Sequence, residues 1–110
     1  TIHIVRPYEE RKQMFKESSY VYPNPVRTFG KIKCILHEPA DLKIEIFDIL
    51  GNLVWSKMVN YVLGEYLFNW DVTNTSGRKI KRGIYLCSLE ARETETNKKL
   101  KAINKFMVIK

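Results

Sequence analysis

The chain has 110 residues, the length of one domain with a single hydrophobic core and too short for two domains. Hydrophobic residues make up 45% and charged residues 28%, as in globular proteins, and no apolar run is long enough for a membrane-spanning helix. The formal charge of +7, from 19 Lys and Arg against 12 Asp and Glu, suits an anionic partner. Most lysines alternate with apolar residues, however, and this pattern is at least as typical of the solvated face of β-strands.

The first 20 residues differ from the rest of the chain. Residues 1–5 are compatible with a strand, whereas residues 8–16 are charged and lack sustained apolar spacing. The sequence opens at Thr1, with neither an initiator Met nor a signal peptide. We therefore expect residues 1–20 to be a linker or the tail of a preceding domain, in a piece of a longer precursor.

Residues 21–110 are predicted to be all-β, because apolar and polar residues alternate with period two in several runs. Strands are expected at 31–36, 42–46, 52–58, 66–70, 84–91 and 101–109. Turn residues separate these runs at 23–25, 38–39, 50–52, 63–64 and 76–77. The clearest hairpin is at Gly51 and Asn52, which both accept positive φ. The spacing predicts a seven-stranded immunoglobulin-like antiparallel β-sandwich.

The parity of each strand predicts which side chains face the core. The predicted core residues are Ile32, Cys34, Leu36, Ile44, Ile46, Trp55, Phe68, Trp70, Tyr85 and Leu89. A polar loop follows Trp70, with Asp71, Asn74 and Ser76 as possible oxygen ligands for calcium. Because only Asp71 is a carboxylate, we expect side chains that cap their own backbone in Asx and Ser turns instead of a metal site.

Cys34 and Cys87 share the parity of core residues, and both are expected to face the interior from opposite sheets. With Trp55 between them and Tyr85 two residues before Cys87, they imitate the cysteine, tryptophan and tyrosine pattern of antibody domains. A disulfide between them is one interpretation. The alternative is a pair of free, buried cysteines, because cysteine is also a common small core residue.

The sequence indicates neither catalysis nor a cofactor. His3 lies in the expected linker and His37 at a strand end, and no Ser, Cys or Asp has the spacing to build a nucleophile around either. The two cysteines and two histidines match no zinc pattern. We therefore expect no catalytic residue, no metal site and no enzymatic activity in this chain.

Five motifs occur in one order along the chain. They are Tyr22-Pro23-Asn24-Pro25, residues 44–54, Asn69-Trp70-Asp71 with Ser76-Gly77, Gly83-Ile84-Tyr85-Leu86, and residues 105–110. Together they resemble the C-terminal sorting domain of type IX secretion cargo in Bacteroidetes, which shares its fold with the immunoglobulin-like domain of flagellar hook-capping proteins. Residues 37–42, 53–55 and 77–86 also resemble the C-terminal domain of the type IX sortase, a gingipain-type cysteine peptidase whose Cys and His would lie upstream of Thr1.

The resemblance implies that residues 21–110 are a non-catalytic domain recognised by the type IX machinery. The domain would direct secretion through the periplasm, or retention at the outer-membrane surface, and end at that surface or outside the cell. Candidate recognition residues are Lys105, Phe106, Met107, Val108, Ile109 and Lys110 in the terminal strand, and Arg78, Lys79, Lys81 and Arg82 in a basic turn. From the residues alone, an ordinary edge strand and a solvated loop explain both segments equally well.

Two alternative functions stay open. One is an accessory β-sandwich that stabilises an upstream catalytic domain of the same chain. The other is a module that binds carbohydrate or lipopolysaccharide, for which Tyr61 and Tyr66 are the candidate exposed aromatic residues. No nucleic-acid partner is expected.

Overall fold

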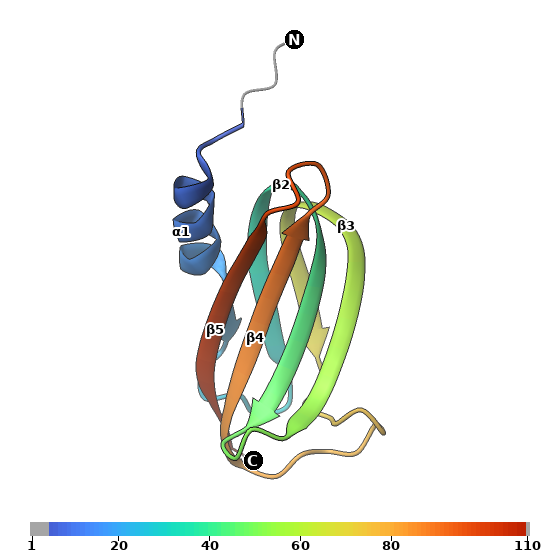
Figure 1. Ribbon diagram of the computed structural model, residues 1–110. Coiled ribbons are helices and arrows are strands. Elements are labelled where there is room, and N and C mark those ends of the chain that lie inside the picture. Colours follow the sequence, from blue (N-terminus) through green and yellow to red (C-terminus); the bar gives the residue numbers. More distant parts are fainter. Residues whose placement is uncertain (1–4, 110) are drawn as a thin grey trace.

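The computed structural model describes residues 5–109 and shows one helix followed by five strands (Figure 1). The elements are α1 (Tyr8–Ser18), β1 (Tyr20–Tyr22), β2 (Gly30–Asp48), β3 (Leu53–Trp70), β4 (Gly83–Glu93) and β5 (Lys99–Val108). All strand pairs are antiparallel, and the strands form one hydrogen-bonded sheet that curls around the core. The expectation of an essentially all-β chain is confirmed.

Strand β2 organises the sheet, because three other strands pair with it. Its first part pairs with β1 and with the end of β3. Its second part pairs with the start of β3 on one side and with β4 on the other. Strand β5 pairs along its length only with β4, so β5 lies at an edge of the sheet.

The sheet has five strands where the sequence predicted seven. The predicted ranges 31–36 and 42–46 both lie in β2, and 66–70 and all but the first residue of 52–58 lie in β3, so the six ranges given above form four strands. The fifth, β1, was not predicted. The expected turn at 38–39 falls where the pairing of β2 with β3 shifts register, and Gly64, in the other expected turn, adopts a φ of +83° inside β3. Turn residues here bend long strands instead of ending them.

The parity of the strands predicts most of the core correctly. The buried predicted residues are Ile32, Cys34, Leu36, Ile44, Ile46, Trp70, Tyr85 and Leu89. Trp55 and Phe68 stack on each other at 5.4 Å between ring centroids but are only partly buried. Both lie on β3, which has a neighbouring strand on one side only, so this part of the core is less covered than parity suggested.

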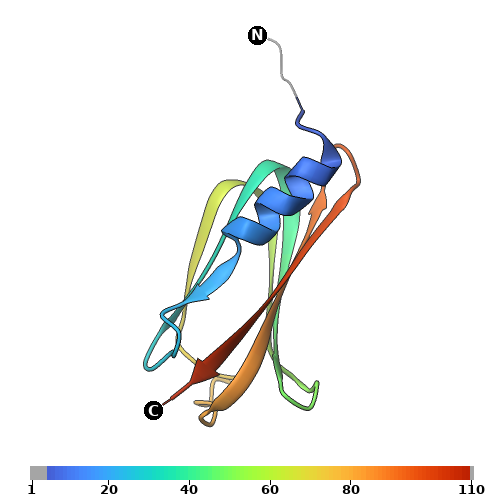
Figure 2. The same ribbon diagram turned by 90° about the vertical axis from the view of Figure 1, so that its left-hand side faces the viewer.

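The segment expected to be a linker contains a helix that packs on the sheet. Glu9 and Glu10 in its first turn and Lys16 in its last turn suit the helix dipole. Only Arg11 and Phe15, one helical turn apart, are buried, and they lie on the side of α1 that contacts β5 and β2 (Figure 2). Whether residues 1–20 also join this chain to a preceding domain stays a prediction, and most of the possible strand at 1–5 lies outside the described residues.

A buried ion pair fastens α1 to the end of β4. Arg11 Nε and Nη2 donate to the two carboxylate oxygens of Glu93 at 2.7 and 2.6 Å, and the exposed fraction of each side chain is 5% or less. Thr96 also donates its hydroxyl to Glu93, and the charge of buried Glu38 acts on Arg11. The bidentate geometry fixes the helix in both position and orientation.

Candidate functional site

The two segments predicted to carry recognition lie at the same end of the molecule. Figure 1 shows the loop between β3 and β4, which contains the basic turn, beside the C-terminal end of β5 and the hairpin that joins β2 to β3. A hollow of about 310 Å³ is lined by both segments, with Lys79 and Ile80 from the turn and Val108 from β5. Arg27 and Thr28 complete the lining with Val72. Sequence reasoning missed Arg27, although it lies only two residues after the Pro-Asn-Pro motif.

Asn74 orders the loop that carries the basic turn. Its Oδ1 accepts hydrogen bonds from the backbone N–H of Ser76 at 3.1 Å, from the Ser76 hydroxyl at 3.0 Å and from the backbone N–H of Arg78 at 3.0 Å. The N–H of Ile80 donates to the carbonyl of Val72 at 3.1 Å. The predicted Asx turn is therefore confirmed, and the loop presents its basic residues in a defined conformation.

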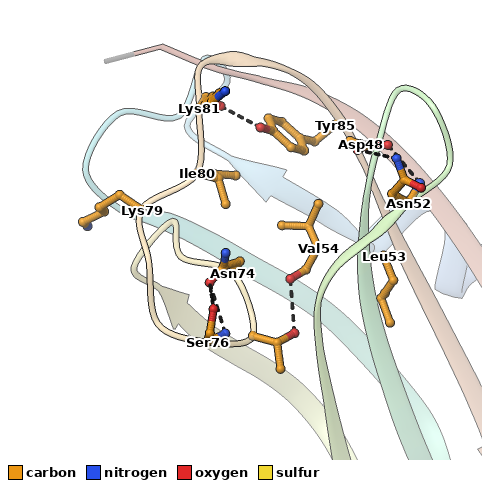
Figure 3. Close-up of a pocket in the computed structure, with 11 residues that line it drawn as sticks. Asp48, Asn52, Leu53, Val54, Asn74, Ser76, Lys79, Ile80, Lys81 and Tyr85 are labelled. Atoms are coloured by element: carbon orange, nitrogen blue, oxygen red, sulfur yellow. Dashed lines mark hydrogen bonds between the residues drawn. The ribbon is translucent and has the colours of Figure 1, made fainter.

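A second, open hollow of about 670 Å³ separates this loop from the β2–β3 hairpin (Figure 3). Ile80 and Val54 supply apolar surface from its two sides, and Tyr85 donates its hydroxyl to the carbonyl of Lys81 at 2.6 Å. Asp48 accepts from both the N–H and the side-chain amide of Asn52, and these bonds lower the pKa of its carboxyl. The Asp48 carboxylate thus stabilises the β2–β3 hairpin, and its lowered pKa does not suit proton transfer near neutral pH.

The basic turn is mostly unpaired. Lys79 donates to the backbone carbonyl of Asp71 at 2.6 Å, whereas Arg78, Lys81 and Arg82 are exposed and form no ion pair within residues 5–109. Positive charges that lack internal partners raise the potential of this end and steer the approach of an anionic surface.

The terminal strand divides into core and surface residues. Phe106 and Val108 are 2% exposed, and the Phe106 ring packs edge-on against Trp70 at 5.8 Å between centroids. The accessible side chains are those of Lys105, Met107 and, in part, Ile109. Phe106 and Val108 are therefore core residues, while Lys110 lies outside the described residues.

The outer edge of the strand's last residues is already covered. Val26 forms a parallel bridge with Val108, donating to the carbonyl of Met107 at 2.7 Å and accepting from the N–H of Ile109 at 2.8 Å. Asn24 Oδ1 accepts the N–H of Met107 at 3.0 Å. The Pro-Asn-Pro motif and the C-terminal motif, more than 80 residues apart, thus form one hydrogen-bonded unit. Its backbone groups are not free to pair with a partner strand as long as this bridge holds.

Cys34 and Cys87 are both fully buried and both free in this structure. Burial raises the pKa of the Cys34 thiol to about 12, and burial together with the charge of Cys34 raises that of Cys87 to about 12. Neither group is therefore a thiolate nucleophile at neutral pH. The disulfide stays a prediction.

Thiol counting separates the two interpretations of the cysteines. With free thiols, native protein at pH 8 should react with a thiol reagent at less than about a hundredth of the rate of an exposed cysteine, because burial suppresses the thiolate. Unfolding in denaturant without reductant should then release two reactive thiols. Release of none, followed by two after reduction, would establish the bridge.

The remaining chemistry of the described part of the chain is sparse. Residues 5–109 contain no group of three or more His, Cys, Asp or Glu side chains placed to hold a metal ion. His37 is exposed at the bend of β2, and His3 lies outside the described residues. Within the same residues, no helix has the length and apolar character needed to cross a membrane.

Comparison with known families gives a match over most of the chain. A family described as "Secretion system C-terminal sorting domain" matches residues 20–103. No curated protein matches the sequence.

Solved structures show where this fold occurs elsewhere. Dimeric latent PorU from Porphyromonas gingivalis is similar with a TM-score of 0.70 and 25% identity, covering 84% of this chain and 9% of PorU. PorZ, described as an essential surface component of the type IX secretion system of the same bacterium, has a TM-score of 0.58 and 22% identity over 90% of this chain and 12% of PorZ. FlgD from Xanthomonas campestris, described in terms of hook capping in flagellar assembly, has a TM-score of 0.59 and 19% identity, covering 90% of this chain and 74% of FlgD. The chain thus spans only a small part of PorU and PorZ, and the likeness to PorZ and FlgD is one of fold.

Proposed function

The chain belongs to the family of secretion system C-terminal sorting domains, and we propose that it directs type IX secretion or surface retention through recognition by another protein. The family match over residues 20–103 carries this proposal. The similarity to PorU, at 25% identity over 84% of the chain, supports the type IX assignment. On this proposal the partner is a component of the secretion machinery, and the destination after the periplasm is the outer-membrane surface or the cell exterior.

The recognition surface is the end of the sheet where the basic turn meets the terminal strand. Lys81 and Arg82 supply unpaired positive charge on an ordered loop, and Lys105 and Met107 supply accessible side chains on the strand. In the lining of the hollow between them, Ile80 is partly exposed and gives a partner an apolar surface to desolvate, whereas Val108 is 2% exposed and forms its floor. The positive charge would set the rate of encounter with the partner, and the apolar lining of the hollow would set the lifetime of the complex.

We infer that the curled sheet works as the two layers of an immunoglobulin-like sandwich. One layer consists of β1, the first part of β2 and the end of β3, and the other consists of the start of β3, the second part of β2, β4 and β5. Counted in this way, the five strands supply seven segments. The fold likeness to FlgD supports this description.

An accessory role beside an upstream domain is the second candidate, and the outer side of β3 favours it. Met58, Tyr61 and Leu63 are each about 60% exposed on this strand, at 61%, 62% and 59%. Such a row of apolar side chains suits packing against another domain. Carbohydrate or lipopolysaccharide binding is less well supported, because neither Tyr61 nor Tyr66 lines the hollows beside the basic turn.

A reporter fusion tests the sorting function. The whole chain, including α1 because its Phe15 completes the core, is fused to a neutral periplasmic reporter in a type IX-competent bacterium. We expect surface delivery of the intact fusion and a loss of at least about tenfold with Lys81→Glu and Arg82→Glu together, because the change reverses the charge that steers encounter. A second variant, Lys105→Glu, tests the strand.

The matched control is Lys98→Glu, a charge reversal at another exposed lysine, which lies in the turn between β4 and β5 at the opposite end of the sheet. It should leave delivery unchanged. If the intact fusion folds but stays in the periplasm, the sorting function is wrong and the accessory role takes its place.

A further inference from the structure

The middle of the outer edge of β5 has unpaired backbone groups. Backbone groups of successive residues in a strand point to alternate sides, and those of Met107 point away from β4, toward Val26. The N–H and C=O groups of Lys101, Ile103 and Lys105 therefore also point away from β4. No group within the described residues hydrogen-bonds to them there.

This open stretch is bounded at both ends by the chain itself. At the start of β5, the Tyr8 hydroxyl at the beginning of α1 donates to the carbonyl of Lys99 at 2.5 Å. At the other end, Val26 pairs with residues 107–109. Between these contacts five residues, spanning about 17 Å, have no strand hydrogen-bonded to their outer edge, although α1 and β1 also contact β5. Val26 demonstrates that a chain can occupy this side of β5 in extended conformation.

A groove follows the open stretch. It encloses about 440 Å³ and is lined by Lys16 near the end of α1 and by residues 101–104 of β5. The side-chain nitrogen Nδ2 of Asn104 is buried at this place and has no hydrogen-bond partner in the structure. A buried donor without an acceptor costs about 1 to 3 kcal/mol, so an occupant that supplies an oxygen would remove this cost.

The charged side chains that line the groove, Lys16 and Lys101, are both positive. Lys16, Lys101 and Lys105 form no ion pair within residues 5–109, and no carboxylate lines the groove. Ile103, in the middle of the stretch, is 60% exposed and offers an apolar contact between the lysines. The face that carries Lys101, Ile103 and Lys105 therefore complements an extended segment with carboxylates at every second position, because those side chains all lie on one face.

We propose that the edge of β5 between Lys101 and Lys105 is a docking site for an acidic peptide segment, which adds to the sheet as a further strand. Backbone hydrogen bonds to Lys101, Ile103 and Lys105 fix its register, and Asn104 Nδ2 donates to one of its oxygens. The site is separate from the basic turn and shares only Lys105 with the recognition surface proposed above, so its occupancy does not depend on the proposed sorting function.

Lysines on an edge strand also have a simpler use, which is to discourage pairing with another copy of the chain. That use explains the charges of Lys101 and Lys105. It explains neither the groove beside them nor the buried, unpartnered amide of Asn104. An acidic strand satisfies all of these features, because it neutralises the lysines that repel a basic one.

The probe is an acetylated, amidated peptide of sequence Glu-Val-Glu-Val-Glu-Val, titrated into the ¹⁵N-labelled whole chain. We expect saturable amide shifts confined to Lys16 and residues 101–105, weakening as salt is added. The matched peptide with lysine in place of glutamate should produce none. Ile103→Pro, which removes an outward N–H at a position tolerant of proline, should weaken binding at least about tenfold.

Two further measurements distinguish pairing through the backbone from attraction by charge alone. A Glu-Val peptide methylated on alternate backbone nitrogens should lose binding to the same extent as Ile103→Pro, whether or not that variant folds. Lys101→Glu should weaken binding of the acidic peptide about tenfold. The proposal is overturned if no saturable shift appears up to about 1 mM peptide, or if the methylated peptide binds equally well, since attraction by charge alone then accounts for the result.

Discussion

Replacement of Trp70 by alanine is expected to lower the free energy of unfolding by about 3 to 5 kcal/mol, the usual loss for a large buried aromatic residue. Its ring is 1% exposed and lies 6.1 Å from Trp55 and 5.8 Å from Phe106, measured between ring centroids. Its Nε1 donates to the carbonyl of Thr73 at 3.1 Å, and that carbonyl would lose its partner. The added Cβ of a residue at Gly30 would lie 3.4 Å from the ring, so the site is closely packed.

Urea unfolding followed by circular dichroism measures this loss. Leu67→Ala, on the same strand but 46% exposed, is the matched control and should cost less than about 1 kcal/mol. A loss below 1 kcal/mol for Trp70→Ala would contradict the packing described around this ring.

The features that the sequence predicts well are those set by neighbouring residues. Gly51 and Asn52 end one strand and start the next because the φ of Gly51 is +89° and the Asp48 side chain caps the turn, and both requirements are visible locally. Alternation likewise places Ile44 and Ile46 in the core without knowledge of their partners, since the period-two rule depends only on one buried face.

The features that the sequence conceals depend on residues far apart. Helix α1 shows little apolar spacing because only two of its side chains are buried, and one of them is Arg11, whose partner Glu93 lies 82 positions away. The turn expected at 38–39 is likewise wrong, since β2 stays extended through Pro39 between its pairing with β3 at Leu36 and its pairing with β3 and β4 at Ala40. The hydrogen bond from the Met107 N–H to the Asn24 side chain is likewise visible only in the folded chain.

Removal of one partner from the buried pair of Arg11 and Glu93 should lower the free energy of unfolding as much as the replacement of Trp70 by alanine. Arg11→Met leaves the Glu93 carboxylate without its bidentate partner in a site that is 1% exposed, and such changes typically cost about 3 to 5 kcal/mol. The double variant Arg11→Met with Glu93→Leu removes both charges, so it should be far closer to the wild-type stability. Lys12→Met, which breaks the exposed pair with Glu9 and the contact of the ammonium group with the Tyr8 ring, is the control and should cost less than about 1 kcal/mol.

The pair also predicts how stability depends on pH. Burial by itself would raise the pKa of Glu93, but the hydrogen bonds from Arg11 and Thr96 and the charge of Arg11 outweigh it and lower the pKa below its ordinary value of 4.5. The stabilisation is therefore complete above about pH 4.5 and is lost as the pH falls toward the lower pKa of the folded state. Urea midpoints measured from pH 7 to pH 3 should fall more steeply for the wild type than for the double variant. Equal slopes would mean that this carboxyl does not titrate in the range, and that the acid sensitivity arises elsewhere in the chain.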